Sequence, residues 1–124
     1  MSDVTIWHNP RCSKSRAALE ILQEAGVTPA VRLYLEAPPR PAELAEVVRL
    51  LGGSPRGCLR TGEAPYKELG LSDSNKSDAE LIDAMVEHPI LIERPIVIAG
   101  DKAVIGRPPE RVREILDRQA PVLT

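Results

Sequence analysis

The first 35 residues change their hydrophobic period twice, and this change limits the possible folds more than any other feature. Apolar residues alternate with others over residues 4–7, which is typical of a short strand. Residues 13–25 then place Ala18, Leu22 and Ala25 on one helical face, and alternation returns over residues 31–35. A strand, a helix and a second strand in this order predict a parallel pair.

The middle of the chain is predicted to be helical. Pro41 opens a segment with helical spacing that ends at Gly52. The sequence of residues 77–80 is a capping box, which predicts a helix over residues 81–86 that stops at His88 and Pro89. Loops and short turns are expected over residues 54–76.

The last third returns to strands. Residues 96–99 and 103–105 are two apolar runs separated by a hairpin signal, Gly100-Asp101-Lys102. Pro108 then starts a last helix, with Val112, Ile115 and Leu116 facing inward. The order β-α-β, helical insert, β-β-α predicts an α/β thioredoxin-like fold with a mixed sheet. We expect a single domain over residues 1–124, with the helical insert at about residues 40–89.

Composition excludes several classes of function. Only three of the 124 residues are aromatic and the net charge is −2, so a nucleic-acid stacking surface is not expected. The two cysteines and two histidines give neither a disulfide framework nor a convincing zinc site. No apolar run approaches the roughly 18 residues of a membrane span. We therefore expect a cytoplasmic protein with no membrane, nucleic-acid or metal partner.

Cys12 is the strongest candidate for a reactive residue. It falls in the turn between the first strand and the first helix, where unpaired backbone N–H groups favour a thiolate. No acidic residue occurs from Val4 through Leu19, while His8 and several cations surround the cysteine: Arg11, Lys14 and Arg16. A protonated His8 close to the sulfur would add to the effect. The alternative is that Cys12 is a small buried residue and His8 a structural one.

The active-site turn contains a single thiol. Ser15 stands where a dithiol oxidoreductase would carry its second cysteine. A mixed disulfide on Cys12 must therefore be resolved by Cys58 or by a thiol from another molecule. We interpret Cys58 as a packed or incidental thiol.

A thiolate among fixed cations also indicates an anionic substrate, because the same positive field attracts an oxyanion. Arginine suits this task because its planar fork binds tetrahedral oxyanions through two hydrogen bonds. Three arginines occupy places that a solvated surface explains poorly: Arg60, Arg94 and Arg107. A surface ion pair is the alternative for each of them, and spacing alone does not single them out from the other arginines of the chain.

The residues around these positions resemble a known family, the glutaredoxin-coupled arsenate reductases. The resemblance extends from about residue 4 to residue 117 and rests on five blocks: His8 to Arg16, Leu33 to Glu36, Leu59-Arg60, His88 to Val97 and Gly106 to Pro108. The pair Ser13-Lys14 and the short chain place it nearest to the shorter members of that family.

The resemblance implies a function and a set of site residues. Cys12 would be the nucleophile that attacks arsenic, and His8 would help to keep it ionised. Arg60, Arg94 and Arg107 would bind the oxyanion, and the Arg94-Pro95 bond would be cis. Arsenate would be reduced to arsenite for arsenical resistance, with glutathione as co-substrate, glutaredoxin as partner and no bound cofactor.

Two other functions remain open at this point. A sister family with this fold contains redox-responsive regulators that bind RNA polymerase, although those proteins typically use a two-cysteine switch that Ser15 removes here. The chain could also be a glutathione-dependent thiol oxidoreductase that acts on protein mixed disulfides.

Overall fold

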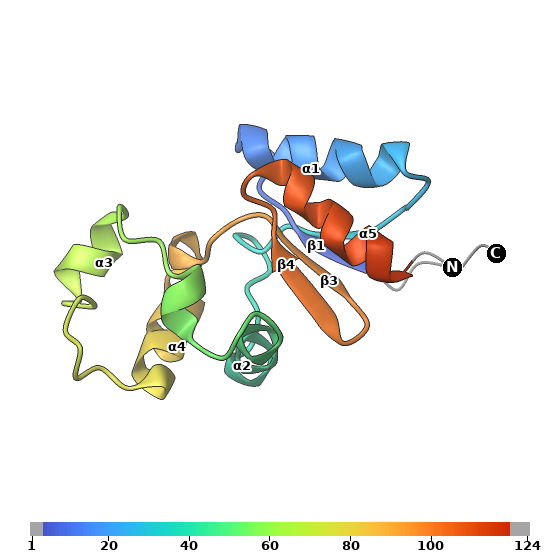
Figure 1. Ribbon diagram of the computed structural model, residues 1–124. Helices are drawn as coiled ribbons and strands as arrows, with labels where there is room; N and C mark the ends of the chain where they lie inside the picture. The colour runs from blue at the N-terminus through green and yellow to red at the C-terminus, as the bar shows by residue number, and fades with distance from the viewer. Residues whose placement is uncertain (1–3, 120–124) are drawn as a thin grey trace. The chain divides into compact units, whose positions relative to one another are not determined.

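A computed structural model describes residues 4–119 of the chain, with side chains up to Leu116 (Figure 1). The helices and strands are, in chain order, β1 (Val4–Trp7), α1 (Ser13–Glu24), β2 (Ala30–Arg32), α2 (Pro41–Leu50), α3 (Ala64–Glu68), α4 (Asp78–Glu87), β3 (Ile96–Ala99), β4 (Lys102–Ile105) and α5 (Arg113–Gln119). Three short 3-10 helices are η1 (Pro55–Cys58), η2 (Pro89–Leu91) and η3 (Pro109–Val112). The elements form two compact units, one from residues up to Leu33 together with those from Arg94 onward, and the other from Tyr34 to Glu93.

The first unit contains a mixed sheet with the strand order β2-β1-β3-β4. The central strand β1 pairs in parallel with β2, where Ile6 faces Val31, and antiparallel with β3, where Ile6 faces Val97. β3 and β4 pair antiparallel through a tight turn that starts at Gly100, whose φ is +60°. This arrangement confirms the predicted α/β, thioredoxin-like sheet.

The core of this unit lies on one face of the sheet, beneath α1, η3 and α5 (Figure 1). Its buried residues come from alternate strand positions and from the apolar stripes of the helices: Val4, Ile6, Ala18, Leu22, Val97, Ala99, Val104, Val112 and Ile115. Burial of each large aliphatic side chain contributes about 1.5–3 kcal/mol. This packing fixes the start of α1 relative to β1 and β3.

The second strand is shorter than predicted. It ends at Arg32 rather than continuing to Leu35, and both Val31 and Leu35 are exposed, by 48% and 41%. Among the strands that the structure describes, β2 lies at the edge of the sheet and pairs with β1 alone, and β1 ends at Trp7, opposite Arg32. The prediction is wrong for residues 33–35 because the length of an edge strand is set by its partner, which its own alternation does not reveal.

The second unit is helical, with α2 packed against α4. The predicted capping box is confirmed: Glu80 N–H donates to Ser77 Oγ at 3.1 Å, and Ser77 N–H donates to Glu80 Oε1 at 2.8 Å. The expected loops over residues 54–76 contain the short helices η1 and α3. The predicted insert at residues 40–89 lies within this unit, and the assignment of the whole chain to a single domain stays a prediction. Among residues 4–119, no helix has the length and apolar character to cross a membrane.

Candidate active site

Cys12 is the N-cap residue of α1, as the turn chemistry of the sequence predicts. Its backbone N–H donates to Asn9 O at 3.0 Å, and its carbonyl accepts the first bond of the helix, from Arg16 N–H at 3.0 Å. The first turn of α1 carries no acidic residue, and the cysteine is partly exposed. The sulfur therefore lies at the positive end of a 12-residue helix dipole and is accessible to a reactant.

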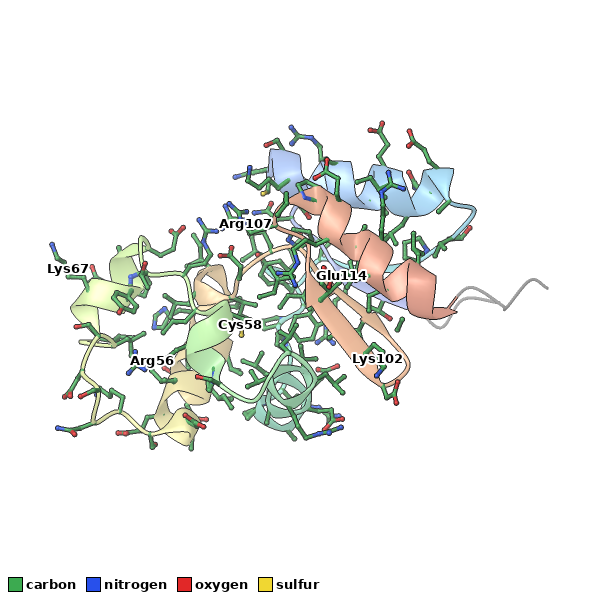
Figure 2. All side chains as sticks on the ribbon, in the orientation of Figure 1. Arg56, Cys58, Lys67, Lys102, Arg107 and Glu114 are labelled. Carbon is green, nitrogen blue, oxygen red and sulfur yellow. The ribbon has the colours of Figure 1, made fainter. Side chains whose placement is uncertain are left out.

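Arg107 brings a full positive charge to the sulfur from the far end of the chain. Its Nη1 lies 4.0 Å from Cys12 Sγ and donates to the carbonyl of Arg94 at 3.2 Å. Figure 2 labels Arg107, which lies between β4 and η3. The structure thus brings together three of the predicted site residues, Cys12, Arg94 and Arg107. Arg94 takes part through its backbone carbonyl, which helps to position Arg107.

Gly106 allows the segments that carry these two arginines to pack closely. A Cβ atom at this position would lie 2.9 Å from Pro95 Cγ and 3.1 Å from Val112 Cγ1. Gly106 N–H also donates to Pro95 O at 2.9 Å. The Arg94-Pro95 bond is cis, as the family resemblance implies, and the Arg107-Pro108 bond is also cis, which the sequence analysis did not predict.

His8 is buried and is bound to Ser15 by a 2.7 Å hydrogen bond from its Nδ1 to the serine Oγ. Burial lowers the pKa of His8 below 6.5, and the positive charge of Arg16 lowers it further. The imidazole is therefore mainly neutral at neutral pH. Its assistance to Cys12 stays a prediction and would be given by the neutral form rather than by a charge.

Ser15 is a site residue whose contacts the sequence analysis missed. Its fully buried hydroxyl accepts the N–H of Asn9 at 3.0 Å and bonds to His8, so it ties the turn before Cys12 to the first turn of the helix. The spacing of Ser15 along the helix indicates that its side chain is buried. Ser15, Ala18 and Leu22 lie at i, i+3 and i+7, which places a serine on the buried face of α1.

Arg60 belongs to the second unit, where it lies between two carboxylates. Its Nη1 contacts Glu93 Oε1 at 2.8 Å, and its Nη2 contacts Glu63 Oε2 at 3.0 Å. Burial acts to lower the pKa of Arg60, but the hydrogen bonds and charges of the two glutamates outweigh it and raise the pKa above its usual value. The guanidinium helps to line a hollow of about 210 Å³ with four other residues: Leu59, Thr61, Gly62 and Glu93. A role for Arg60 beside Cys12 stays a prediction.

Cys58, which Figure 2 labels, lies in the second unit. Its side chain is buried, with 1% of its surface exposed. Its thiol is 3.5 Å from Pro55 O. Burial, assisted by the negative charge of Glu93, raises the pKa of this thiol to about 11. Cys58 is therefore protonated at neutral pH and is a poor nucleophile. Among the described residues, no group of three or more histidine, cysteine or acidic side chains is placed to hold a metal ion.

Comparison with known proteins identifies the family. The model of the ArsC family matches residues 7–115. The chain belongs to the ArsC family. It is 55% identical over 114 residues to the uncharacterized protein YfgD of Escherichia coli K12, covering 91% of this chain and 96% of the relative. It is 47% identical over 117 residues to an arsenate reductase of Neisseria meningitidis, covering 94% and 100% of the two chains.

A solved structure, an arsenate reductase from Vibrio cholerae, has the same fold as this ArsC chain. The TM-score is 0.88 at 50% sequence identity, covering 90% of this chain and 96% of the other. The resemblance to the arsenate reductase family that the sequence motifs indicated is thereby confirmed, together with the thioredoxin-like fold.

Proposed function

We propose that this ArsC-family chain is a cytoplasmic arsenate reductase that converts arsenate to arsenite, with glutathione and glutaredoxin as electron donors. The observation that carries the proposal is the Arg107 guanidinium 4.0 Å from Cys12 Sγ, at the start of a helix with no acid in its first turn. This arrangement stabilises a thiolate and attracts an oxyanion to the same point. Relatives of similar length carry the name arsenate reductase.

The first step forms a bond between Cys12 Sγ and arsenic. The thiolate attacks As(V), and one arsenate oxygen leaves as water after it gains protons, so arsenic keeps its oxidation state in the adduct. Arg94 and Arg107, with Arg60 as a third ligand, would balance the negative charge of the remaining oxygens. His8 and Ser15 would hold the turn that presents the sulfur.

The second step transfers two electrons. The thiolate of glutathione attacks Cys12 Sγ, a disulfide bond forms, and the electron pair of the breaking sulfur–arsenic bond stays on arsenic. Arsenic leaves as arsenite, As(III), and the two sulfurs are oxidised together. A glutaredoxin thiol then reduces the mixed disulfide and restores Cys12. The pKa of Cys58, raised to about 11, disfavours this residue as an internal substitute for glutathione. In this cycle the chain carries no bound cofactor.

The test is an arsenate reduction assay that contains glutathione, glutaredoxin, glutathione reductase and NADPH. We expect the wild-type chain to oxidise NADPH in an arsenate-dependent reaction and Cys12→Ser to show only the background rate. A Cys58→Ala variant serves as the matched single-cysteine control and should retain turnover. Equal rates for wild type and Cys12→Ser would refute the proposal.

A further inference from the structure

The backbone of Arg60 is fixed by a short antiparallel contact between two segments of the second unit. Arg60 N–H donates to Leu91 O at 2.7 Å, and Glu93 N–H donates to Cys58 O at 2.8 Å. The two segments form an isolated β-bridge between these bonds. The bonds fix the start of the Arg60 side chain, whose far end is then set by the groups that the guanidinium contacts.

Two glutamates hold the guanidinium at different points. Nη1 contacts Glu93 Oε1 at 2.8 Å. Nε and Nη2 contact Glu63 Oε2 at 3.1 Å and 3.0 Å. A contact at Nη1 alone lets the planar group rotate about that point, whereas a second contact along the Nε–Nη2 edge fixes its plane. Glu63 therefore supplies a constraint on Arg60 that the bond to Glu93 does not.

The carboxylate of Glu63 serves Arg60 rather than its own helix. Glu63 is the N-cap residue of α3, a position whose side chain commonly accepts a backbone N–H of the helix. Its side chain makes no such bond. The carbonyl of Glu63 accepts Tyr66 N–H at 3.0 Å, so the start of the helix fixes the backbone that carries the carboxylate. Glu63 thus presents an acceptor on a fixed backbone to Arg60.

This contact leaves part of the guanidinium available to a ligand. The bonds to the two glutamates use three of its five N–H groups. One N–H on Nη1 and one on Nη2 have no hydrogen-bond partner among the residues that the structure describes. Arg60 lines the hollow of about 210 Å³, and Glu63 is not among the residues that line it. An oxyanion in the hollow can therefore accept from Arg60 without displacing Glu63.

We propose that Glu63 is a positioning residue, which holds Arg60 by its Nε–Nη2 edge so that the guanidinium is ordered before arsenate binds. The inference rests on the proposed function, in which Arg60 is a ligand of the substrate, and adds the residue that prepares this ligand. An arginine side chain that is not held loses its rotamer freedom when the anion binds, and this cost weakens binding. Glu63 removes that cost in advance.

The test measures arsenate binding in the hollow. NMR of the full-length chain, at pH 7 and constant ionic strength, follows the backbone amides of Thr61 and Gly62 during titration with sodium arsenate, because both residues line the hollow. We expect Glu63→Ala to bind arsenate about tenfold more weakly than wild type, the order of effect of one hydrogen bond between charged groups. Glu63→Gln keeps an acceptor oxygen and should lose less.

Glu68→Ala is the matched control. It removes a carboxylate from the same helix, but Glu68 is exposed and is not a residue that Arg60 contacts. Its arsenate affinity should equal that of wild type. The exchange of the Arg60 Nε proton with water should be slow in wild type and Glu68→Ala and faster in Glu63→Ala, because Glu63 accepts this proton. Amide spectra report whether each variant is folded.

A double variant tests whether Glu63 acts through Arg60. Arg60→Ala should weaken arsenate binding by itself. When Glu63→Ala is added to Arg60→Ala, we expect no further loss, because the group that Glu63 positions is already absent. An equal loss from Glu63→Ala in both backgrounds would show that Glu63 acts independently of Arg60 and would overturn the inference.

The charge of Glu63 predicts the opposite result. A carboxylate that only repelled the anion would give tighter arsenate binding in Glu63→Ala and Glu63→Gln than in wild type, and either result would overturn the inference. Wild-type amides of Thr61 and Gly62 that respond to no arsenate would also overturn it.

The outcome is separable from that of the proposed function. The predicted changes in binding without arsenate turnover would contradict the proposed function alone. Arsenate turnover with undiminished binding by Glu63→Ala would contradict the inference alone.

Discussion

At the scale of single residues, the N-terminus of α1 and the charge of Arg107 both act on Cys12 Sγ, and they differ in strength. A helix N-terminus contributes about 0.3–1 kcal/mol to a nearby negative charge. A unit charge at 4 Å contributes about 1 kcal/mol in bulk water and about 4 kcal/mol at the effective dielectric of a protein surface. Arg107 Nη1 is at this distance from the sulfur, and the site is partly exposed. Arg107 should therefore stabilise the thiolate more than the helix does.

Replacement of Arg107 tests this ranking. We expect Arg107→Ala to lower the rate of Cys12 alkylation by iodoacetamide at pH 7 about tenfold, because the thiolate loses a positive charge that lies 4.0 Å away. Arg107→Lys keeps the charge, so alkylation should stay close to the wild-type rate, while KM for arsenate rises because the planar fork is lost. Intact-mass spectrometry measures the alkylation. Wild-type alkylation of Arg107→Ala would show that the guanidinium does not stabilise the thiolate.

His8 gives a pH-dependent contribution to stability. Its pKa is lowered by burial and by Arg16, so protonation favours the unfolded chain. The folded state is therefore expected to lose stability as pH falls below the unfolded value of 6.5 and through the lower folded pKa, and to be unaffected by this group above 6.5. Urea unfolding of wild type and His8→Gln between pH 5 and pH 7.5 measures the effect. Parallel pH profiles for the two proteins would contradict it.

At the scale of elements, the segments before β3 and after β4 are fixed to each other at Gly106, and this contact positions Arg107. Gly106 N–H bonds to Pro95 O at 2.9 Å, and the missing side chain leaves room for Pro95 and Val112. The glycine is required here by close approach rather than by a positive φ. The position of the arginine thus depends on a neighbour that has no side chain.

A methyl group at Gly106 should therefore disturb both stability and the site. We expect Gly106→Ala to reduce the free energy of unfolding by about 1–3 kcal/mol, the usual effect of overpacking a filled core. It should also slow Cys12 alkylation as Arg107 shifts. Gly57→Ala is the control, because a Cβ there meets no atom within 4 Å. Equal unfolding midpoints in urea for both variants would show that the contact is not tight.

The elements that the sequence predicts well are those whose signals are local. The apolar stripe of α1, the capping box at Ser77 and the hairpin at Gly100 each depend on residues within a few positions of one another, and all three are confirmed. The end of β2 was missed because it depends on where β1 stops.

The same distinction holds for the site. Cys12 and its turn follow from the local sequence. Two long-range contacts do not follow from it, because only the fold brings their residues together. They are the bond of Arg60 to Glu93, 33 positions away, and the bond of Arg107 to Cys12, 95 positions away. Ser15 could have been found from its spacing on the buried face of α1, whereas the lowered pKa of His8 follows from burial that the sequence did not show.

At the scale of the whole molecule, the two cysteines belong to different units and differ in reactivity. Cys12 is partly exposed, and Cys58 is buried with a pKa raised to about 11. A chain with one reactive thiol can supply only one of the sulfurs in the disulfide that accompanies a two-electron reduction. The second sulfur must then come from another molecule.

Removal of Cys58 tests the source of that second sulfur. We expect Cys58→Ala to keep most of the wild-type arsenate turnover with glutathione and glutaredoxin, because the buried thiol takes no part. When glutaredoxin is omitted, mass spectrometry should detect one glutathione per chain, attached to Cys12, in wild type and variant alike. A Cys12–Cys58 disulfide in the wild-type chain, together with loss of turnover in the variant, would contradict an external source.

The unit that holds Cys12 is assembled from two separated stretches of chain, up to Leu33 and from Arg94 onward. Its central strand β1 finds one neighbour, β2, early in the chain and the other, β3, only after residue 95. On the ribosome, the sheet therefore stays incomplete until β3 (Ile96–Ala99) has been made. Arg94 and Arg107 are synthesised in the same late stretch. A nascent chain therefore exposes Cys12 before it contains these two arginines, which would recruit an oxyanion to the sulfur.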